Sequence, residues 1–222
     1  MTHPALTPGR TAVITGGASG IGLAAARRFA GLGLNLVLAD LPGERLEAAA
    51  AAVREMGVEV LAVPTDVADR SAVEALKAAA YDRFGEVGVL MNNAGVGRGG
   101  AAYERYDDWS RVLGVNLWGV INGVQAFVPA MLAQGTPGLV INTGSKQGIT
   151  TPPGDTAYNV SKAGVKALTE GLEHSLRNAE GGRRITAHLL VPGFTWTGIT
   201  GGGRTEQPPG AWSADQVVDF MM

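Results

Sequence analysis

Six short apolar segments alternate with longer amphipathic ones along almost the whole chain, and this alternation restricts the folds open to it. The short segments are rich in Val, Ile and Leu and lie at residues 11–15, 35–39, 58–63, 87–91, 139–142 and 185–191. Helical spacing covers residues 23–32, 44–56, 71–84, 106–133 and 155–179, and a further helix starts at 213. Strands that alternate with helices form parallel βαβ units. We therefore predict an α/β fold with a doubly wound parallel sheet.

Length and composition exclude several classes of protein. The 222 residues suffice for one sizeable core, so we expect residues 1–222 to form a single domain. The net charge of −2, without a basic block, argues against nucleic acid as a partner. There is no cysteine, and the three histidines lack ligand spacing, so neither disulfides nor a metal site is expected. The absence of an apolar leader and of a long apolar run predicts a soluble, cytoplasmic protein without a membrane partner.

A glycine-rich loop follows the first predicted strand. Gly16, Gly20 and Gly22 precede a helix, which is the context in which backbone amides and a helix N-terminus hold a pyrophosphate. Their spacing, Gly-x-x-x-Gly-x-Gly, differs from the Gly-x-Gly-x-x-Gly of the common dinucleotide fingerprint. By itself, the loop is therefore weak support for phosphate binding.

Asp40 stands at the end of the second predicted strand, about 20 residues after the glycine loop. An acid at this place binds the adenosine ribose hydroxyls and repels a 2′-phosphate. Its neighbour Leu41 is not basic, and neither is Ser19 in the loop, so NAD is favoured over NADP. The alternative is that Asp40 is only a turn residue before Pro42.

Tyr158 and Lys162 lie four residues apart, so their side chains share one face of the last long helix. An ammonium group about 4 Å from a phenol contributes ~4 kcal/mol at an effective dielectric near 20. Lowering the pKa of tyrosine from ~10 toward ~7 needs roughly that amount. The pair would make a base near neutral pH. The spacing is common, however, and an exposed helix with an unrelated Tyr and Lys is the alternative.

Other features indicate a site at the carboxyl ends of the strands, where doubly wound sheets bind ligands. Residues 92–95 read Asn-Asn-Ala-Gly, a small polar turn. Ser71 and Glu74 form a capping-box pattern, which would leave Asp66 free to touch a ligand. Asn116 lies in an apolar stretch, so its amide needs partners, either in core backbone or in a functional site. Residues 194–213 are loop-like and long enough to form a substrate lid.

In this order the motifs resemble those of the short-chain dehydrogenase/reductase (SDR) family, over nearly the whole chain. Residues 15–22 resemble the family's Thr-Gly-x-x-x-Gly-x-Gly loop, which accounts for the glycine spacing. Residues 192–197 look like its Pro-Gly segment, which holds the nicotinamide carboxamide, and residues 92–95 look like its Asn-Asn-Ala-Gly turn. Ser145 precedes Tyr158 by 13 residues, as in the family's Ser and Tyr-x-x-x-Lys set, and Asn116 matches the fourth member of its catalytic tetrad.

The resemblance implies a Rossmann fold with strand order 3-2-1-4-5-6 and an oxidoreductase that moves a hydride between NAD(H) and an alcohol or carbonyl substrate. Tyr158 would be the general acid or base, and Lys162 would lower its pKa and bind the nicotinamide ribose. Ser145 would hydrogen-bond the reacting oxygen, and Asn116 would hold a water that links Lys162 to solvent. The implied cofactor contacts are Gly16, Ser19, Gly20, Ile21, Gly22, Asp40, Asp66, Val67, Asn93, Ala94, Gly95, Tyr158, Lys162, Pro192, Gly193, Thr195 and Thr197.

The substrate, a small alcohol or ketone, is the least constrained part of the prediction. Candidate contacts are Val96, Gln147 and Trp196, while Lys146 either meets a polar or acidic substrate group or is simply solvated. Family members usually pair through the helices that correspond to residues 106–133 and 155–179, so a homodimer or homotetramer is expected. Family chains usually continue to a seventh strand, which this sequence lacks, and this suggests a truncated sequence or a missing tail.

Two alternatives stay open at this point. The first is an NADPH-preferring carbonyl reductase of the same fold, against which Asp40 argues. The second is a dinucleotide-binding regulatory protein without turnover. The intact set of Ser145, Tyr158 and Lys162 argues against the second, because a protein that performs no catalysis does not need all three.

Overall fold

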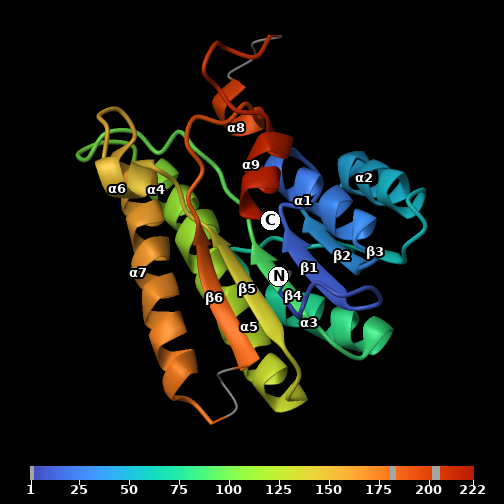
Figure 1. Cartoon of the computed structure of the whole chain (residues 1–222). Helices are drawn as coiled ribbons and strands as arrows, with labels where there is room; N and C mark the ends of the chain where they lie inside the picture. Colours follow the sequence, from blue (N-terminus) through green and yellow to red (C-terminus); the bar gives the residue numbers. More distant parts are fainter. Residues whose placement is uncertain (1–2, 181–183, 202–205) are drawn as a thin grey trace.

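The computed structural model describes residues 3–180, 184–201 and 206–222 (Figure 1). The strands are β1 (Thr11–Thr15), β2 (Asn35–Asp40), β3 (Val60–Pro64), β4 (Val89–Asn92), β5 (Gly138–Thr143) and β6 (Ile185–Leu190). The longer helices are α1 (Gly20–Gly31), α2 (Glu44–Arg54), α3 (Arg70–Phe84), α4 (Tyr106–Leu113), α5 (Gly119–Gln134), α7 (Thr156–Asn178) and α9 (Ala214–Met221). A π-helical turn, η1 (Gly114–Trp118), joins α4 to α5, and α6 (Gln147–Thr150) and α8 (Gly198–Gly201) are single turns.

The strands form one parallel sheet in the order β3-β2-β1-β4-β5-β6, which confirms the predicted Rossmann arrangement. β1 lies between β2 and β4, with Val13 in register with both Val37 and Leu90. The strands β2 and β3 therefore lie on one side of β1, and β4, β5 and β6 lie on the other, so the strand order reverses between β1 and β4. In an open parallel sheet this reversal leaves a crevice at the carboxyl ends of the strands.

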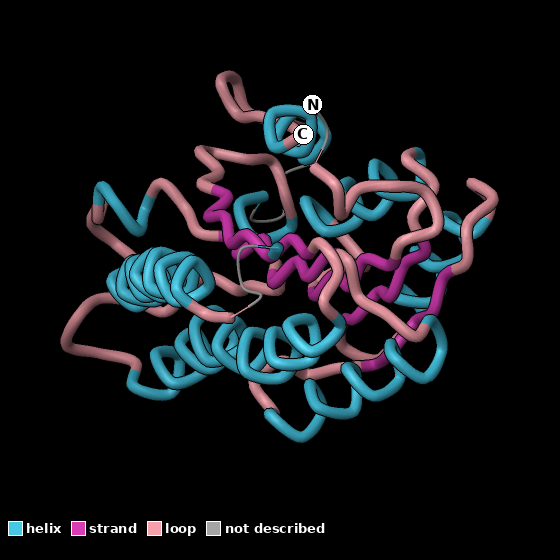
Figure 2. The backbone as a smooth tube through the Cα atoms, turned by 60° about the horizontal axis from the view of Figure 1, so that its bottom comes forward, coloured by secondary structure: helices cyan, strands magenta, loops and turns pink. Residues whose placement is uncertain are grey.

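Helices cover both faces of the sheet, which crosses the middle of Figure 2. Ile14 and Val13 are neighbours in β1, and their side chains point to opposite faces. Ile14 packs with α1, α2 and α9, where Phe29 is fully buried. Val13 packs with α3, α5 and α7, where Phe127 is fully buried. These two cores hold the carboxyl ends of the strands in place.

Most elements were predicted from the sequence, with ends that differ by at most three residues. The cap of α3 was not. Asp69 caps this helix by accepting from the Ser71 backbone N–H at 2.8 Å and from the Ser71 hydroxyl at 2.7 Å. Glu74 instead pairs with Lys77 one turn later. The predicted capping box of Ser71 and Glu74 is therefore wrong, because an earlier carboxylate takes the cap position.

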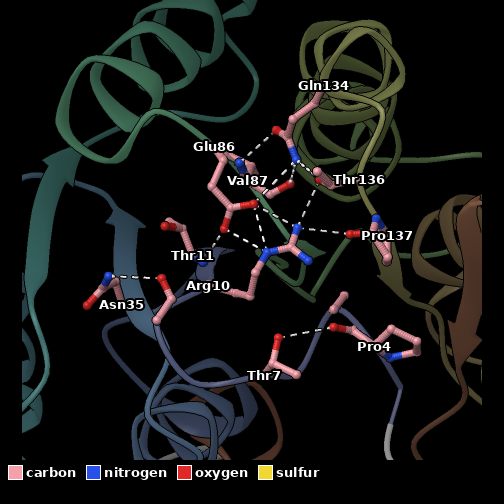
Figure 3. A network of polar contacts seen from close by, with 12 residues as sticks. Pro4, Thr7, Arg10, Thr11, Asn35, Glu86, Val87, Gln134, Thr136 and Pro137 are labelled. Carbon is pink, nitrogen blue, oxygen red and sulfur yellow. Dashed lines mark hydrogen bonds and ion pairs between the residues drawn. The ribbon is translucent and has the colours of Figure 1, made fainter.

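A polar network ties together the amino ends of three strands, at the edge opposite the crevice (Figure 3). Glu86 Oε1 accepts from Arg10 Nε at 2.8 Å and from the Thr11 backbone N–H at 3.1 Å. Arg10 Nη2 also donates to the Pro137 carbonyl at 2.9 Å. Gln134 Nε2 completes the network on Glu86 Oε2 at 3.5 Å. Because Thr11, Glu86 and Pro137 lie at or just before β1, β4 and β5, the network fixes the starts of these strands.

One helical stretch, Tyr106–Gln134, is long and apolar enough to cross a membrane, which the sequence analysis did not anticipate. Its most apolar window is 56% buried inside the protein. α5, the larger part of this stretch, packs on the sheet, so its apolar side chains serve the core.

The predicted lid is held by a short parallel bridge between Thr195 and Trp212. The Trp212 N–H donates to the Phe194 carbonyl at 2.9 Å, and the Trp196 N–H donates to the Trp212 carbonyl at 2.8 Å. Residues 202–205 of the predicted 194–213 lid lie outside the described residues.

Candidate active site

The sequence motifs meet at the carboxyl edge of the sheet, around a cavity of about 600 Å³. Every predicted cofactor contact except Gly22 lines it, as do Ser145, Tyr158 and Lys162 of the predicted catalytic set. Asn116 lies behind the wall and is fully buried. Residues that are more than 140 positions apart in the sequence thus share one cavity.

The glycine loop closes tightly against the Asn-Asn-Ala-Gly turn. A Cβ on Gly16 would lie 2.8 Å from Ala94 Cα, and Gly16 has a φ of 64°, so only glycine fits there without strain. Gly22 does not line the cavity but packs directly against the glycine loop, since a Cβ on it would lie 2.2 Å from the Gly16 carbonyl oxygen.

The N-terminus of α1 opens into the same cavity, through Ser19 and Gly20. The Ser19 side chain makes no capping hydrogen bond, and the first turn of α1 carries no acid. The amides of this turn and the positive end of the helix dipole suit a diphosphate. The residues present therefore fit the pyrophosphate of a dinucleotide.

Thr15 and Asn93 hold the glycine loop and the Asn-Asn-Ala-Gly turn together. Thr15 Oγ1 accepts from the N–H groups of Asn93 and Ala94 at 3.0 and 3.1 Å. Asn93 Nδ2 donates back to the carbonyls of Thr15 and Gly16 at 3.1 and 3.3 Å. Both walls of the cavity are thereby fixed to the end of β1.

Asp40 lines the cavity at the end of β2 and is engaged by three groups. Its Oδ2 accepts from the Ala18 N–H at 3.1 Å and its Oδ1 from the Leu41 N–H at 2.9 Å. Arg45 Nη2 also lies 3.2 Å from Oδ1, and Arg45 itself lines the cavity. The carboxylate is therefore paired with a cation that was not predicted from the sequence, because Arg45 is five residues away, in the first turn of α2.

The environment of Tyr158 differs from the expectation. Burial raises the pKa of its phenol, and the charge of Asp155 raises this pKa further, while a hydrogen bond with Ser145 opposes the shift. In the polypeptide by itself the pKa therefore moves opposite to the predicted direction. The spacing of Tyr158 and Lys162 carried no information about how deeply the phenol would be buried.

Lys162, the expected source of positive charge beside Tyr158, is itself deeply buried. Its ammonium group is buried and donates to the Thr143 carbonyl at 2.7 Å, and its Nζ lies 5.7 Å from the centroid of the Tyr158 ring. Burial lowers the pKa of Lys162 to about 8. The lysine is thus still mainly protonated at pH 7, and its charge lies beside the ring of Tyr158.

Asn116 lies in the π-helical turn and bonds backbone across the core, one of the two roles considered from sequence. Its Oδ1 accepts from the Val96 N–H at 2.7 Å, and its Nδ2 donates to the Val96 carbonyl at 2.8 Å and to Ser161 Oγ at 3.2 Å. Both amide hydrogens of the side chain are therefore used. The π-turn places this amide opposite Val96.

A second cavity of about 410 Å³ adjoins the first, and Ser145 and Tyr158 line both. Of the predicted substrate contacts, Gln147 lines this second cavity and Val96 the first, whereas Trp196 lines neither. Phe194 lies at the second cavity instead. Trp196 is tied through its backbone to Trp212 on the other side of the lid bridge.

Comparison with known proteins agrees with this geometry. Residues 10–208 match the family model described as short chain dehydrogenase. The chain belongs to this family. Short-chain dehydrogenases are oxidoreductases that bind nicotinamide dinucleotides, and the parallel sheet described above has the strand order of this family.

Two relatives and one solved structure illustrate that the chain is a member of this family. The 1-deoxy-11-beta-hydroxypentalenate dehydrogenase of Streptomyces exfoliatus is 37% identical over 187 residues, which are 83% of this chain and 66% of that protein. The 3beta-hydroxysteroid dehydrogenase 2 of Eggerthella lenta is 36% identical over 204 residues, or 91% of this chain and 77% of that protein. A short chain dehydrogenase/reductase of Burkholderia phymatum in complex with NAD superposes with a TM-score of 0.91 at 39% identity, covering 100% of this chain and 86% of that one.

Proposed function

We propose that the protein is an NAD(H)-dependent oxidoreductase that interconverts an alcohol and a carbonyl compound, with Tyr158 as the general acid or base. The observation that carries the proposal is that Ser145 and Tyr158 line both cavities, so one can hold a dinucleotide and the other a small substrate. In the oxidation, the phenolate of Tyr158 takes the hydroxyl proton as the hydride leaves the carbon. When bound, the nicotinamide dinucleotide accepts or supplies that hydride.

The raised pKa of Tyr158 has to fall for this role. The buried ammonium group of Lys162 lies 5.7 Å from the centroid of the Tyr158 ring and would supply the effect, because an opposite charge favours the phenolate. Ser145 Oγ would donate to the reacting oxygen as negative charge develops there. Asn116 has its side-chain N–H groups engaged by Val96 and Ser161, so a bridging water would be held by its backbone carbonyl.

The first test is nucleotide binding followed by turnover. Wild-type protein is titrated with NADH and NADPH and then assayed with NAD and a panel of secondary alcohols that starts with cyclohexanol. We expect tighter binding of NADH. Tyr158→Phe should keep NADH binding within about twofold and lower kcat by roughly 10²–10⁴-fold, because a positioned acid or base contributes that much.

Tyr106→Phe is the matched control, since Tyr106 is 82% exposed and lines neither cavity. Turnover by Tyr158→Phe at the rate of the control would contradict the proposed role of Tyr158. Binding of neither nucleotide would contradict the proposal as a whole. Binding without turnover by wild type on any alcohol would favour a regulatory protein.

An NADPH-preferring reductase is the second candidate, and Arg45 is the observation that favours it. Its guanidinium lies 3.2 Å from Asp40 and could bind a 2′-phosphate at the same edge of the cavity. Arg45→Ala should then weaken NADPH about tenfold, the effect of one charged hydrogen bond, and change NADH less than about twofold. A parallel loss for both nucleotides would mean that Arg45 only orients Asp40.

The remaining parts of the proposal concern substrate, lid and assembly. The substrate is a small alcohol or ketone bound in the 410 Å³ cavity, with residues 194–213 as its lid. Trp118 and Val160 leave 57% and 46% of their surfaces exposed on η1 and α7, which supports a homodimer or homotetramer through these helices. We place the protein in the cytoplasm and treat the whole chain as one domain.

A further inference from the structure

The carboxylate of Asp155 accepts three backbone hydrogen bonds from two separate segments. Its Oδ2 accepts from the Arg98 N–H at 2.9 Å. Its Oδ1 accepts from the Gly99 N–H at 2.9 Å and from the Tyr158 N–H at 3.3 Å. The bond from Tyr158 is the N-cap of α7, whereas Arg98 and Gly99 follow the Asn-Asn-Ala-Gly turn after β4. One side chain therefore connects residues 96–100 to the helix that carries the phenol.

Residues 96–100 are packed tightly against the first turn of α7. A Cβ on Gly99 would lie 2.4 Å from the Ala157 side chain, so a larger residue would push the segment away. The Thr156 N–H donates to the Gly100 carbonyl at 2.9 Å. Arg98 has a φ of 68°, a left-handed conformation that costs a non-glycine residue free energy unless its surroundings hold it. The bond from the Arg98 N–H to Asp155 holds it, together with a bond from Arg111 Nη2 to the Arg98 carbonyl at 3.4 Å.

The same segment forms a wall between the two cavities. Val96 lines the larger cavity, Gly97 and Arg98 line the smaller, and Tyr158 lines both. Asn116 fixes Val96 through two hydrogen bonds, at 2.7 and 2.8 Å. The wall is thus attached to the buried π-turn at one end and to Asp155 at the other.

We propose that Asp155 is a positioning residue, which holds residues 96–100 against the first turn of α7 and so fixes the wall of the substrate cavity relative to the phenol of Tyr158. The inference rests on the proposed function, because it concerns the geometry of that site. A carboxylate suits the task, since each of its two oxygens can accept more than one N–H. Serine could cap α7 but has one short oxygen, which cannot serve both segments.

The charge of Asp155 gives a second signature. Its negative charge raises the pKa of Tyr158, so removing the charge should ease deprotonation of the phenol. Asp155 is the acid of the smaller cavity, whose cations are Arg98 and Lys146. The charged groups of the larger cavity are Lys162, Arg111, Arg45, Asp40 and Asp66. None of these groups is altered in an Asp155→Ser variant, so a fall in the pKa of Tyr158 would report the loss of the carboxylate and of the wall that it holds.

Asp155→Ser is the decisive variant, and Asp69→Ser is its matched control. Asp69 also caps a helix by accepting a backbone N–H, but it lines neither cavity. Three quantities are measured: hydrogen exchange of residues 96–100, the phenolate absorbance titration of Tyr158 with Tyr158→Phe as blank, and kcat with NAD and the best alcohol of the panel. The first two need no substrate.

For Asp155→Ser we expect exchange of residues 96–100 to be at least about tenfold faster, because the opening of this segment becomes easier. The Tyr158 titration and the pH profile of kcat/KM should both move to lower pH. The kcat should fall about 10²-fold, as expected for a misplaced reactive group, with NADH binding within about twofold. Exchange and titration equal to those of Asp69→Ser would overturn the proposal.

Gly99→Ala tests the same contact with the carboxylate intact, and it serves if Asp155→Ser does not fold. The added methyl group should push the wall from Ala157, so that exchange rises and kcat falls although the charge of Asp155 is kept. The proposal would also be overturned if Gly99→Ala showed the same hydrogen exchange and the same kcat as the wild-type protein. A wild-type protein without nucleotide binding would contradict the proposed function instead, and the exchange and titration measurements would still decide the role of Asp155.

Discussion

Lys162 combines deep burial with a strong hydrogen bond to the Thr143 carbonyl at 2.7 Å. A buried ammonium group is costly unless it is compensated, and here burial lowers its pKa to about 8. A residue of the proposed catalytic set is therefore also one that weakens the fold. Functional sites commonly carry such local costs.

The pH dependence of stability should reveal this cost. The pKa of Lys162 is about 8 in the folded state and ~10.4 in the unfolded state. The free energy of unfolding therefore rises as the pH rises from about 8 to ~10.4. Below about pH 8 Lys162 is protonated in both the folded and the unfolded state, and the full free-energy cost of burying its charge is present. Lys162→Met should be more stable than wild type at pH 7, by about 1–3 kcal/mol, and less so at pH 9.5.

Urea unfolding of both proteins at the two pH values measures the difference, with Lys166→Met as control because Lys166 is an exposed residue of the same helix. A Lys162→Met protein that is less stable than wild type at pH 7 would mean that the bond to Thr143 outweighs the desolvation of the ammonium group.

The positions of the site residues were predictable from sequence only where a motif names them. The glycine loop, the Asn-Asn-Ala-Gly turn and the set of Ser145, Tyr158 and Lys162 all meet at one cavity, as expected from the motifs. Asp155 and Arg45 were missed because their roles arise from contacts across the chain or from a helix turn that no spacing rule covers. The direction of the Tyr158 pKa was missed because burial depends on the packed lid and walls.

At the scale of elements, a chain of buried polar side chains joins the sheet to α7 beneath the site. Asn92 Nδ2 donates to Asn142 Oδ1 at 2.9 Å, and Asn142 Nδ2 donates to Thr169 Oγ1 at 3.0 Å. Thr169 Oγ1 in turn donates to the Val165 carbonyl at 2.7 Å. The chain fixes the ends of β4 and β5 relative to the helix that carries Tyr158.

Thr169→Val keeps the shape of this side chain and removes its hydroxyl, which leaves the buried Asn142 amide without an acceptor. Such an unsatisfied donor costs about 1–3 kcal/mol, and we expect that loss in the free energy of unfolding by urea. Ser175→Ala is the control, because the Ser175 hydroxyl bonds to a carbonyl of the same helix but is exposed. Equal stability of the two variants would show that the buried chain adds nothing.

The secondary structure was predictable at this scale because parallel strands buried on both faces are continuous apolar runs. The ends of helices were less predictable than the strands, because several residues near an end can serve as the cap, as Asp69 shows. The π-turn had no signal in the apolar periodicity of residues 106–133.

At the scale of the whole molecule, the polar network around Arg10 and the two cavities lie at opposite edges of the sheet. The Arg10 and Glu86 network fixes the amino ends of β1, β4 and β5, and the cavities lie at their carboxyl ends. The side chains of Arg10 and Glu86 are only 17% and 25% exposed, so their pairing is screened less than that of a surface pair.

Glu86→Ala should therefore lower stability without altering the site. Loss of the partner of Arg10 and of the acceptor for the Thr11 N–H should cost about 2 kcal/mol, which lowers Tm by roughly 4–8 °C in a protein of this size. NADH binding should stay within about twofold. Glu170→Ala, which breaks an exposed pair with Lys166, should change Tm by less than about 2 °C. A weakened NADH affinity in Glu86→Ala would show that the two edges are coupled.

Because of the π-turn at Gly114–Trp118, the structure around the site depends more on the number of residues in this helical stretch than on their identity. Each residue of an α-helix advances the side chains by about 100°, and a π-turn acts as one residue inserted into that register. Deleting a single residue there would merge α4 and α5 into one continuous helix and rotate one part against the other by about that angle. Asn116 would then leave Val96, and the wall of the cavity would lose its inner attachment. Substitutions along this helix are therefore better tolerated than one deletion at the turn.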